Sequence, residues 1–290
     1  MSPKVSVIIP TYNRPEFIDK AIKSVLNQTY QDFEVIVVDD GTRVRAEDVV
    51  KKIKDNRVVY IKHPENRGGG AARNTGIKKS RGEYVAFLDD DDEWLPEKLE
   101  IQMKEFEKAG DDVGFCFSSV INKTKEGDKT KEVYDGIKNF HEDVLRNFKG
   151  FLTVTLIIKR KVFDEVGGFD ERFPSHQEPD LIIRVTKKYR GLGVNKPLVK
   201  VNMMGDHDHI GANLDKRIAG RRMILNKYLG EFKKKPRFLA KHYFQLAIFL
   251  RDDGEIEEAS EFFKKAWKTN FHWRYFAHYV VMKIKTIYIY

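Results

Sequence analysis

Four consecutive carboxylates are the side chains of this sequence with the clearest chemical potential. Residues Asp89–Asp92 follow directly on the apolar run Tyr84–Leu88, and a short apolar run bounded by polar residues is typical of a buried strand. Two like charges about 4 Å apart repel by roughly 4 kcal/mol at an effective dielectric constant of about 20. A hard divalent cation such as Mg2+ or Mn2+, which prefers oxygen ligands, would relieve that repulsion. The alternative is a solvated acidic loop that starts the next helix, with Pro96 in its first turn.

Polar residues also follow two other apolar runs in the N-terminal part of the chain. The segment Pro10–Arg14 follows Val5–Ile9, and Asp39–Gly41 follows Glu34–Val38. In open parallel sheets, ligands bind outside the carboxyl ends of the strands. Three polar loops at one rim, with Asp89–Asp92 as the third, therefore predict a binding site.

The elements that position these loops alternate regularly through the first ninety residues. Near-continuous apolar strands separated by helices indicate a mostly parallel sheet covered on both faces, an α/β fold. The predicted strands are Val5–Ile9, Glu34–Val38, Val58–Ile61 and Tyr84–Leu88, and the predicted helices are Glu16–Gln28, Ala46–Lys54 and Ala71–Ser80.

The pattern changes beyond residue 100, where we expect the sheet to be extended and the second wall of a cleft to be built. A helix at Leu95–Lys108 precedes strands at Val113–Ser118, Val154–Ile158 and Leu198–Val201, with an exposed hairpin or loop at Asn122–Lys131, a turn at Val166–Asp170 and a helix at Asp180–Tyr189. From about residue 216 the chain is expected to be wholly helical.

The charge of the 290-residue chain is distributed unevenly between residues 1–215 and the expected helical region from residue 216. Residues 216–290 hold 17 Lys and Arg against 7 Asp and Glu, whereas residues 1–215 hold 36 against 37. We therefore expect a domain over 1–215, with a nucleotide-binding half (1–100) and an acceptor half (101–215), and a basic helical region over 216–290. A basic, aromatic C-terminus suits an anionic partner such as a membrane surface. The alternatives are a solubilising helical face, a helix packed on the domain or an oligomer contact.

The number of cysteines and the lengths of the apolar runs indicate where in the cell the protein is expected. The single cysteine, Cys116, excludes an intramolecular disulfide and is consistent with a reducing compartment. The run Val5–Ile9 is too short for a signal-peptide core, and no run approaches the roughly 20 apolar residues that span a bilayer. We expect a cytoplasmic protein, with a peripheral position at the inner face of the cell membrane if the C-terminus binds lipid.

Four motifs, in order and in spacing, resemble the family 2 inverting glycosyltransferases of GT-A fold. They are Val5–Arg14, Val37–Thr42, Gly70–Gly76 and Phe87–Trp94, which resemble the opening strand, the nucleotide-binding turn, the helix before the metal strand and the DxD region. The resemblance runs through about residue 213. It implies transfer of a sugar from a nucleotide-diphosphate donor, with a UDP-sugar favoured, to a glycan or lipid-linked acceptor, with Mn2+ or Mg2+ as cofactor.

The resemblance also implies roles for single residues. Asp91 is the best candidate metal ligand, with Asp89 as the other acid of the D-x-D and with His207 and His209 where the family often has a histidine near the metal or diphosphate. The nucleotide-sugar site would be formed by Pro10, Thr11, Tyr12, Arg14, Asp40, Arg73, Asp89 and Asp90. In this set Tyr12 would stack on the base, Asp40 would accept hydrogen bonds from its edge, and Arg73 would approach the diphosphate or ribose.

Inversion requires a general base that deprotonates the acceptor hydroxyl. Counting back from Arg184 places Glu178 at the position of the family's Asp base, so Glu replaces Asp and Gln177 replaces the preceding acid. Asp180 is the competing candidate, although it fits better as a helix-start or structural acid. On the acceptor side the resemblance implies Trp94, Gly168 and Phe169, with Phe169 offering an apolar face to a sugar; the alternative for this glycine turn is a helix C-cap.

Three other functions fit parts of the pattern. Gly68-x-Gly70 before a helix is typical of an NAD-dependent oxidoreductase, but Arg73 occupies the third small position. A sugar-phosphate nucleotidyltransferase on a similar fold needs a glycine-rich loop after the first strand, where this chain has Pro10–Asn13. A non-enzymatic protein that binds nucleic acid or membrane would explain the basic tail but not the acidic rim, and no nucleic-acid partner is expected.

Overall fold

The structure is a computed structural model that describes residues 2–42, 46–148, 150–204 and 213–288, with the side chains of 285–288 left out. Its residues divide into two compact units: Met1–Glu171 with Glu178–Asp206, and Arg172–Gln177 with His207–Tyr290.

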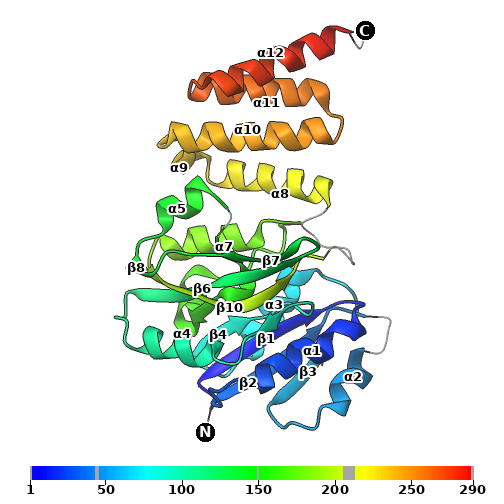
Figure 1. Ribbon diagram of the computed structural model, residues 1–290, viewed down its shortest axis with the longest axis vertical. Helices are drawn as coiled ribbons and strands as arrows, with labels where there is room; N and C mark the ends of the chain where they lie inside the picture. Colours follow the sequence, from blue (N-terminus) through cyan, green and yellow to red (C-terminus); the bar gives the residue numbers. More distant parts are fainter. Residues whose placement is uncertain (1, 43–45, 149, 205–212, 289–290) are drawn as a thin grey trace. The chain divides into compact units, whose positions relative to one another are not determined.

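The first unit is built on one mixed sheet with the strand order β3-β2-β1-β4-β9-β6-β10-β5 (Figure 1). Its strands are β1 (Val5–Thr11), β2 (Phe33–Asp39), β3 (Val58–Lys62), β4 (Tyr84–Phe87), β5 (Glu93–Trp94), β6 (Val113–Thr124), β7 (Gly127–Lys131), β8 (Gly136–Lys138), β9 (Ile157–Lys159) and β10 (Arg190–Asn202). Strands β1 to β4 pair in parallel, as the alternating sequence predicted. The registers Thr11↔Asp39 and Asp39↔Lys62 bring the carboxyl ends of β1, β2 and β3 to one edge.

The helices of this unit form where apolar residues recur at helical spacing. They are α1 (Pro15–Leu26), α2 (Ala46–Lys52), α3 (Gly69–Lys79), α4 (Lys98–Glu107), α5 (His141–Arg146), α6 (Arg160–Val166) and α7 (Gln177–Thr186), with a short 3-10 turn at Thr153–Thr155. Helix α1 buries Ile18, Ala21, Ile22 and Val25. Helix α3 instead lies close on the sheet through small residues, since a Cβ on Gly76 would meet Ile8 at 2.4 Å. That close approach sets the position of Arg73 and Asn74 on the same helix.

The second half of the sheet departs from the sequence predictions in three places. The predicted short strand Leu198–Val201 is the end of the longer strand β10, which pairs in parallel with β6 and carries register shifts. The predicted strand Val154–Ile158 is a 3-10 turn followed by β9, which runs antiparallel to both β4 and β6. Helix α7 begins at Gln177, three residues before the predicted start at Asp180. The hairpin β6–β7 lies where an exposed hairpin or loop was expected.

The second unit is helical, as predicted. It contains α8 (Leu214–Lys227), α9 (Leu229–Lys233), α10 (Pro236–Asp252), α11 (Ile256–Thr269) and α12 (Trp273–Tyr288). Helices α10, α11 and α12 are stacked in chain order (Figure 1). Within the described residues, no helix combines the length and apolar character needed to cross a bilayer.

Candidate active site

The ends of β1 and β4 meet at the acidic segment. Thr11 Oγ1 donates a hydrogen bond to Asp90 Oδ2 over 2.7 Å, and Arg14 Nη1 lies 3.3 Å from Asp90 Oδ1 and 3.0 Å from Asp91 Oδ2. Thr11 and Asp90 are buried and Arg14 is half-buried. The structure therefore brings together two of the polar loops that the sequence predicted at this rim.

Arg73 connects the acidic segment to the candidate base. Its Nη2 lies 2.6 Å from Asp89 Oδ1, and the side chain is buried from solvent. Burial alone would lower the pKa of Arg73, but the nearby charges of Asp89 and Glu178 raise it above its ordinary value. Its Nε is buried and has no hydrogen-bond partner among the described residues. Arg73 therefore contacts Asp89 directly and is influenced by the charge of Glu178, and its spare donor is suited to an anion.

The acidic segment carries more negative charge than its two arginines balance. Burial raises the pKa of Asp90 to about 7, against the lowering effects of Thr11 and Arg14. Burial also raises the pKa of Asp92 to about 9, and the charges of Asp89 and Asp91 act in the same direction. Asp92 Oδ1 accepts a hydrogen bond from the backbone of Asn202 on β10.

These acids fit a divalent cation as an oxygen-donor set. The described part of the chain contains no group of three or more His, Cys, Asp or Glu side chains arranged to hold a metal. Asp89 and Asp91 could each supply one carboxylate, which leaves the other coordination positions to water or to a bound diphosphate. His207 and His209 lie outside the described residues.

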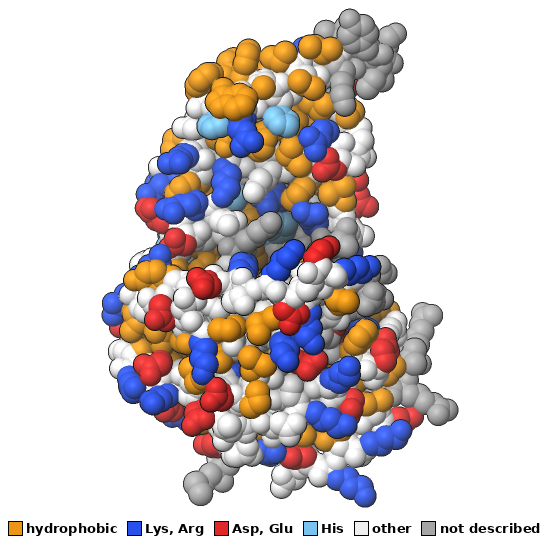
Figure 2. Space-filling model, viewed as in Figure 1, with side chains coloured by type: hydrophobic (Ala, Val, Ile, Leu, Met, Phe, Trp, Pro, Cys, Tyr) orange, Lys and Arg blue, Asp and Glu red, His pale blue; other side chains and the backbone are white. Residues whose placement is uncertain are grey.

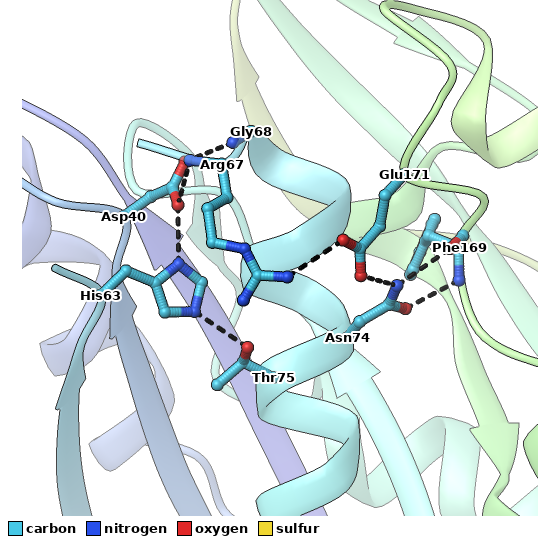
Figure 3. A network of polar contacts seen from close by, with 8 residues as sticks. All are labelled: Asp40, His63, Arg67, Gly68, Asn74, Thr75, Phe169 and Glu171. Carbon is cyan, nitrogen blue, oxygen red and sulfur yellow. Dashed lines mark hydrogen bonds and ion pairs between the residues drawn. The ribbon is translucent and has the colours of Figure 1, made fainter. Parts of the chain in front are cut away.

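Asp40 lies at the same edge, after β2, and its carboxylate organises the loop after β3 (Figure 3). Oδ1 accepts hydrogen bonds from His63 Nδ1 at 2.7 Å and from the backbone of Arg67 at 2.9 Å, and Oδ2 accepts one from the backbone of Gly68 at 2.7 Å. Because a carboxylate has about four acceptor positions, Asp40 retains the capacity for one more donor. The other ring nitrogen of His63, Nε2, lies 2.8 Å from Thr75 Oγ1 on α3.

Pro10 is the penultimate residue of β1, and Tyr12 follows the end of that strand. Pro10 is inside the strand, in register with Val38. Tyr12 is 42% exposed, so its ring is free to contact a ligand. Asn13, the next residue, has a φ of 54° and donates its backbone N–H to Thr42, which turns the chain sharply into α1.

The two candidate bases have different environments. Glu178 lies in the first turn of α7, is half-buried, and accepts a hydrogen bond from Thr153 Oγ1 over 2.8 Å. Asp180 is fully buried and pairs with Arg184 Nη2 at 2.9 Å. Arg184 in turn donates to the carbonyl groups of the turn at 166–168. Asp180 is therefore placed as a structural acid, whereas Glu178 shares the neighbourhood of Arg73.

The three acceptor-side candidates are packed residues. Trp94 is buried, donates Nε1–H to the carbonyl of Val154, and lies under Lys98, whose Nζ is 3.9 Å from its ring centroid. Phe169 is only 4% exposed and packs edge-to-face on Phe87. The expectation that Phe169 offers an apolar face to a sugar is therefore wrong in this structure, because that ring is enclosed.

The glycine turn before Phe169 is a helix C-cap, which the sequence analysis gave as the alternative to an acceptor-side turn. Gly167, with a φ of 78°, is the C-cap of α6. Gly168 lies against α3, where an added Cβ would be 2.2 Å from Asn74 Oδ1.

Asn74 is one of the residues of this site to which the sequence analysis gave no role (Figure 3). Its Oδ1 accepts the N–H of Phe169 at 2.8 Å, and its Nδ2 donates to the carbonyl of Phe169 at 2.9 Å and to Glu171 Oε1 at 2.8 Å. Arg67 lies 3.2 Å from the other oxygen of Glu171. The loop held by Asp40 is thus linked to the turn after α6. A usable signal existed for His63, which lies two residues after the predicted strand Val58–Ile61. No local signal existed for contacts between residues that are 95 positions apart.

Comparison with known proteins agrees with this architecture. Residues 6–169 match the family described as glycosyl transferase family 2. An uncharacterized glycosyltransferase of Methanocaldococcus jannaschii, MJ1057, is 37% identical over 188 residues, covering 63% of this chain and 64% of the relative. The amylovoran biosynthesis glycosyltransferase AmsB of Erwinia amylovora is 32% identical over 211 residues, 69% of each protein. A 107-residue stretch, 36% of this chain and 43% of the relative, is 41% identical to WfaP of Escherichia coli, named as a UDP-Glc:alpha-D-GlcNAc-diphosphoundecaprenol beta-1,3-glucosyltransferase.

Solved structures share the fold at low sequence identity. S. aureus TarS 1–349 in complex with UDP-GlcNAc has a TM-score of 0.71 and 20% identity, covering 91% of this chain and 81% of that one. The mannosyltransferase PcManGT of Pyrobaculum calidifontis, in complex with GDP-Man and Mn2+, has a TM-score of 0.61 and 17% identity, covering all of this chain and 81% of that one. The chain spans less than two thirds of the length of several curated relatives that it matches.

Proposed function

Because the chain belongs to glycosyl transferase family 2, we propose that it is an enzyme that transfers a sugar from a nucleotide-diphosphate donor to a hydroxyl group, with inversion at the sugar carbon. The observation that carries the proposal is the position of Arg73. Its guanidinium pairs with Asp89 and is raised in pKa by both Asp89 and Glu178. The charge of Glu178 acts on the same guanidinium that pairs with Asp89, which supports assigning the donor-side carboxylate and the candidate base to one site.

The donor side is assigned to the loops after β1, β2 and β4. Tyr12 stacks on the base, and the remaining acceptor capacity of Asp40 suits one N–H of a base edge, for which uracil is favoured. The TarS complex with UDP-GlcNAc supports a UDP-sugar as donor. The rest of the proposed donor side is formed by Thr11, Pro10 and Arg14.

We assign the metal to Asp91 and Asp89, with Asp90 and Asp92 as neighbouring buried acids. A bound Mn2+ or Mg2+ would neutralise the charge that develops on the departing diphosphate. The Mn2+ complex of PcManGT supports this assignment. Arg73 would orient the diphosphate through its unpaired Nε–H.

Glu178 is proposed as the general base, which accepts the proton of the acceptor hydroxyl while that oxygen bonds to the sugar carbon. Thr153 holds one of its oxygens, which fixes the orientation of the carboxylate. The turn held by Asn74 would shape the acceptor side. Trp94, Gly168 and Phe169 contribute through packing.

A glycan on a lipid carrier is the proposed acceptor, at the inner face of the cell membrane. WfaP, whose name specifies a diphosphoundecaprenol-linked acceptor, supports this choice. We assign the reaction to residues 1–215 and an accessory role to residues 216–290.

The donor site is tested by calorimetric titration with UDP and GDP, with and without Mn2+. We expect Mn2+-dependent UDP binding that Asp91→Ala weakens by at least about tenfold. If UDP binds tightly without Mn2+ and Asp91→Ala does not change its affinity, the metal assignment is wrong. Absence of all nucleotide binding by a folded protein would remove the proposed function.

The base is tested by following UDP release from UDP-sugars. We expect Glu178→Gln to keep UDP affinity and to lower the transfer rate by about two to four orders of magnitude. Thr153→Val serves as the matched variant, since it removes only the hydrogen bond to Glu178 and should lower the rate less. If Glu178→Gln retains full turnover, the base is misassigned.

A further inference from the structure

The C-terminal end of the helical unit carries an unusual combination of charge and apolar surface. Residues 262–290 contain six Lys and Arg and no Asp or Glu. Figure 2 shows hydrophobic side chains gathered at the α12 end of this unit, with Lys, Arg and His side chains beside them. Such a segment is suited to a negatively charged, partly apolar environment.

Helix α12 has an inner face that is already packed. Met282 is 2% exposed. Tyr275 and His278 pack on Phe244 of α10, and Tyr279 stacks on Trp267 of α11. These contacts hold α12 to the helical unit mainly through this face, and Phe276, at the border of the opposite side, also packs on Trp267.

The opposite side, which we call the outer face, is apolar and exposed. Its members recur at intervals of three, four, one and three residues, which places them on one side of a helix. They are Trp273 (67% exposed), Phe276 (42%), Val280 (37%), Val281 (53%) and Ile284 (49%). Phe271, 73% exposed, precedes the helix on the same segment.

Cations flank the outer face. At 100° per residue, Arg274 and Lys283 fall on its two borders, and both are exposed. Arg274 also lines a cavity of about 480 Å³ between α10 and α12, together with Lys241, His272 and the ring of Tyr275. A cavity with cationic walls and an aromatic side could receive a phosphate headgroup beside the apolar face.

We propose that the outer face of α12 is a docking surface for an anionic phospholipid bilayer, on which the helix lies in the headgroup layer without crossing it. Charge complementarity selects this occupant, because a second copy of the same face would bring Arg274 and Lys283 against the same two cations, and residues 262–290 supply no Asp or Glu to pair with them. Exposed Trp and Phe on a helix bordered by cations suit the interfacial region of a bilayer. The inference rests on the proposed function in one respect, since it would bring the chain to the membrane that carries a lipid-linked acceptor, but the binding itself does not require transfer.

The test is co-sedimentation of the full chain with vesicles of phosphatidylcholine alone or mixed with phosphatidylglycerol. We expect binding to the anionic vesicles only, weakened by at least about tenfold between about 0.1 M and about 0.5 M NaCl. Val280→Glu should weaken binding by at least about tenfold. Val59→Glu on β3 is the matched control, since Val59 is 40% exposed against 37% for Val280, and it should bind as the wild type does.

Equal binding to neutral vesicles, or full binding by Val280→Glu, would overturn the proposal. A wild-type dimer in sedimentation velocity that Val280→Glu dissociates would also overturn the proposal, since the face would then belong to a second copy. The proposal would equally fail if the outer face bound an acidic protein and no vesicles. UDP titration of the same proteins separates the two proposals. Vesicle binding without any nucleotide binding would remove the proposed function and leave this surface, whereas nucleotide binding without vesicle binding would do the reverse.

Discussion

Replacing Gly168 by alanine is expected to destabilise the first unit through a single side chain, that of Asn74. The backbone of Gly168 does not have a positive φ, so alanine is compatible with its conformation. The added Cβ, however, would lie 2.2 Å from Asn74 Oδ1. Asn74 must then rotate away and give up the pair of hydrogen bonds that it makes with the peptide groups of Phe169.

The magnitude follows from those two bonds. Each is worth about 0.5 to 1.5 kcal/mol net, so Gly168→Ala should cost about 1 to 3 kcal/mol of unfolding free energy. The solvent-exposed bond from Asn74 to Glu171 adds little. Asn74→Ala should cost a similar amount, because it removes the same bonds without a clash.

The double variant separates this explanation from a general effect of alanine. With Asn74 already truncated, the new Cβ has no oxygen to displace, so Gly168→Ala/Asn74→Ala should cost about as much as Asn74→Ala alone. The coupling energy should be about 1 to 3 kcal/mol. Gly230→Ala in α9, where an added Cβ would meet nothing within 4 Å, should instead stabilise by roughly 0.5 to 1 kcal/mol.

Urea unfolding followed by fluorescence is the assay. Trp94 is buried in the first unit, and the variants Trp267→Phe and Trp273→Phe would remove the two tryptophans of the helical unit from the signal. Additive costs of the Gly168 and Asn74 changes would refute the reasoning. Gly168→Ala and Asn74→Ala should leave UDP affinity near normal and lower the transfer rate, since the displaced turn lies on the proposed acceptor side.

Three further predictions address charged groups. Burial lowers the pKa of Lys98 to about 7; the unfolded chain then binds more protons between about pH 7 and about pH 10, so stability should rise with pH by up to roughly 1.4 kcal/mol per unit. Lys98→Met should flatten that slope in urea unfolding at several pH values, and an unchanged slope would contradict a buried amine. Arg73→Met leaves Asp89 without its partner and should weaken UDP binding by at least about tenfold in calorimetry; equal affinity would exclude it from the site. Asp180→Asn breaks the buried pair with Arg184 and should cost about 3 kcal/mol, so a thermal melt identical to wild type would remove its structural role.

The nucleotide half could be predicted from the sequence because its signals are local. Each parallel strand there is a continuous apolar run, and each is separated from the next by a helix, so strand direction and the common rim follow from connectivity. The placing of Thr11, Asp40 and Asp90 at one edge needed only that reasoning. Arg14 and Arg73 were also assigned to the nucleotide-sugar site in the sequence analysis, although their pairing with particular acids could not be predicted.

The acceptor half was harder because its order depends on distant contacts. Strand β10 contains Gly191, Gly193 and Pro197, which locally favour a turn. Gly191 is nevertheless required in the strand, since a Cβ there would meet the ring of Phe115 at 2.3 Å. The antiparallel direction of β9 and the clamp of Asn74 on Phe169 likewise depend on partners that no local pattern reveals.

Strand β9 has a mechanical consequence for the first unit. It is hydrogen-bonded to β4 on one side and to β6 on the other. The strands that support the donor loops and those that support the acceptor wall therefore belong to one continuous ladder. Opening the two halves of the sheet about a hinge would break the main-chain hydrogen bonds of β9 either to β4 or to β6, so any adjustment to a ligand falls to the connecting loops while the sheet stays rigid.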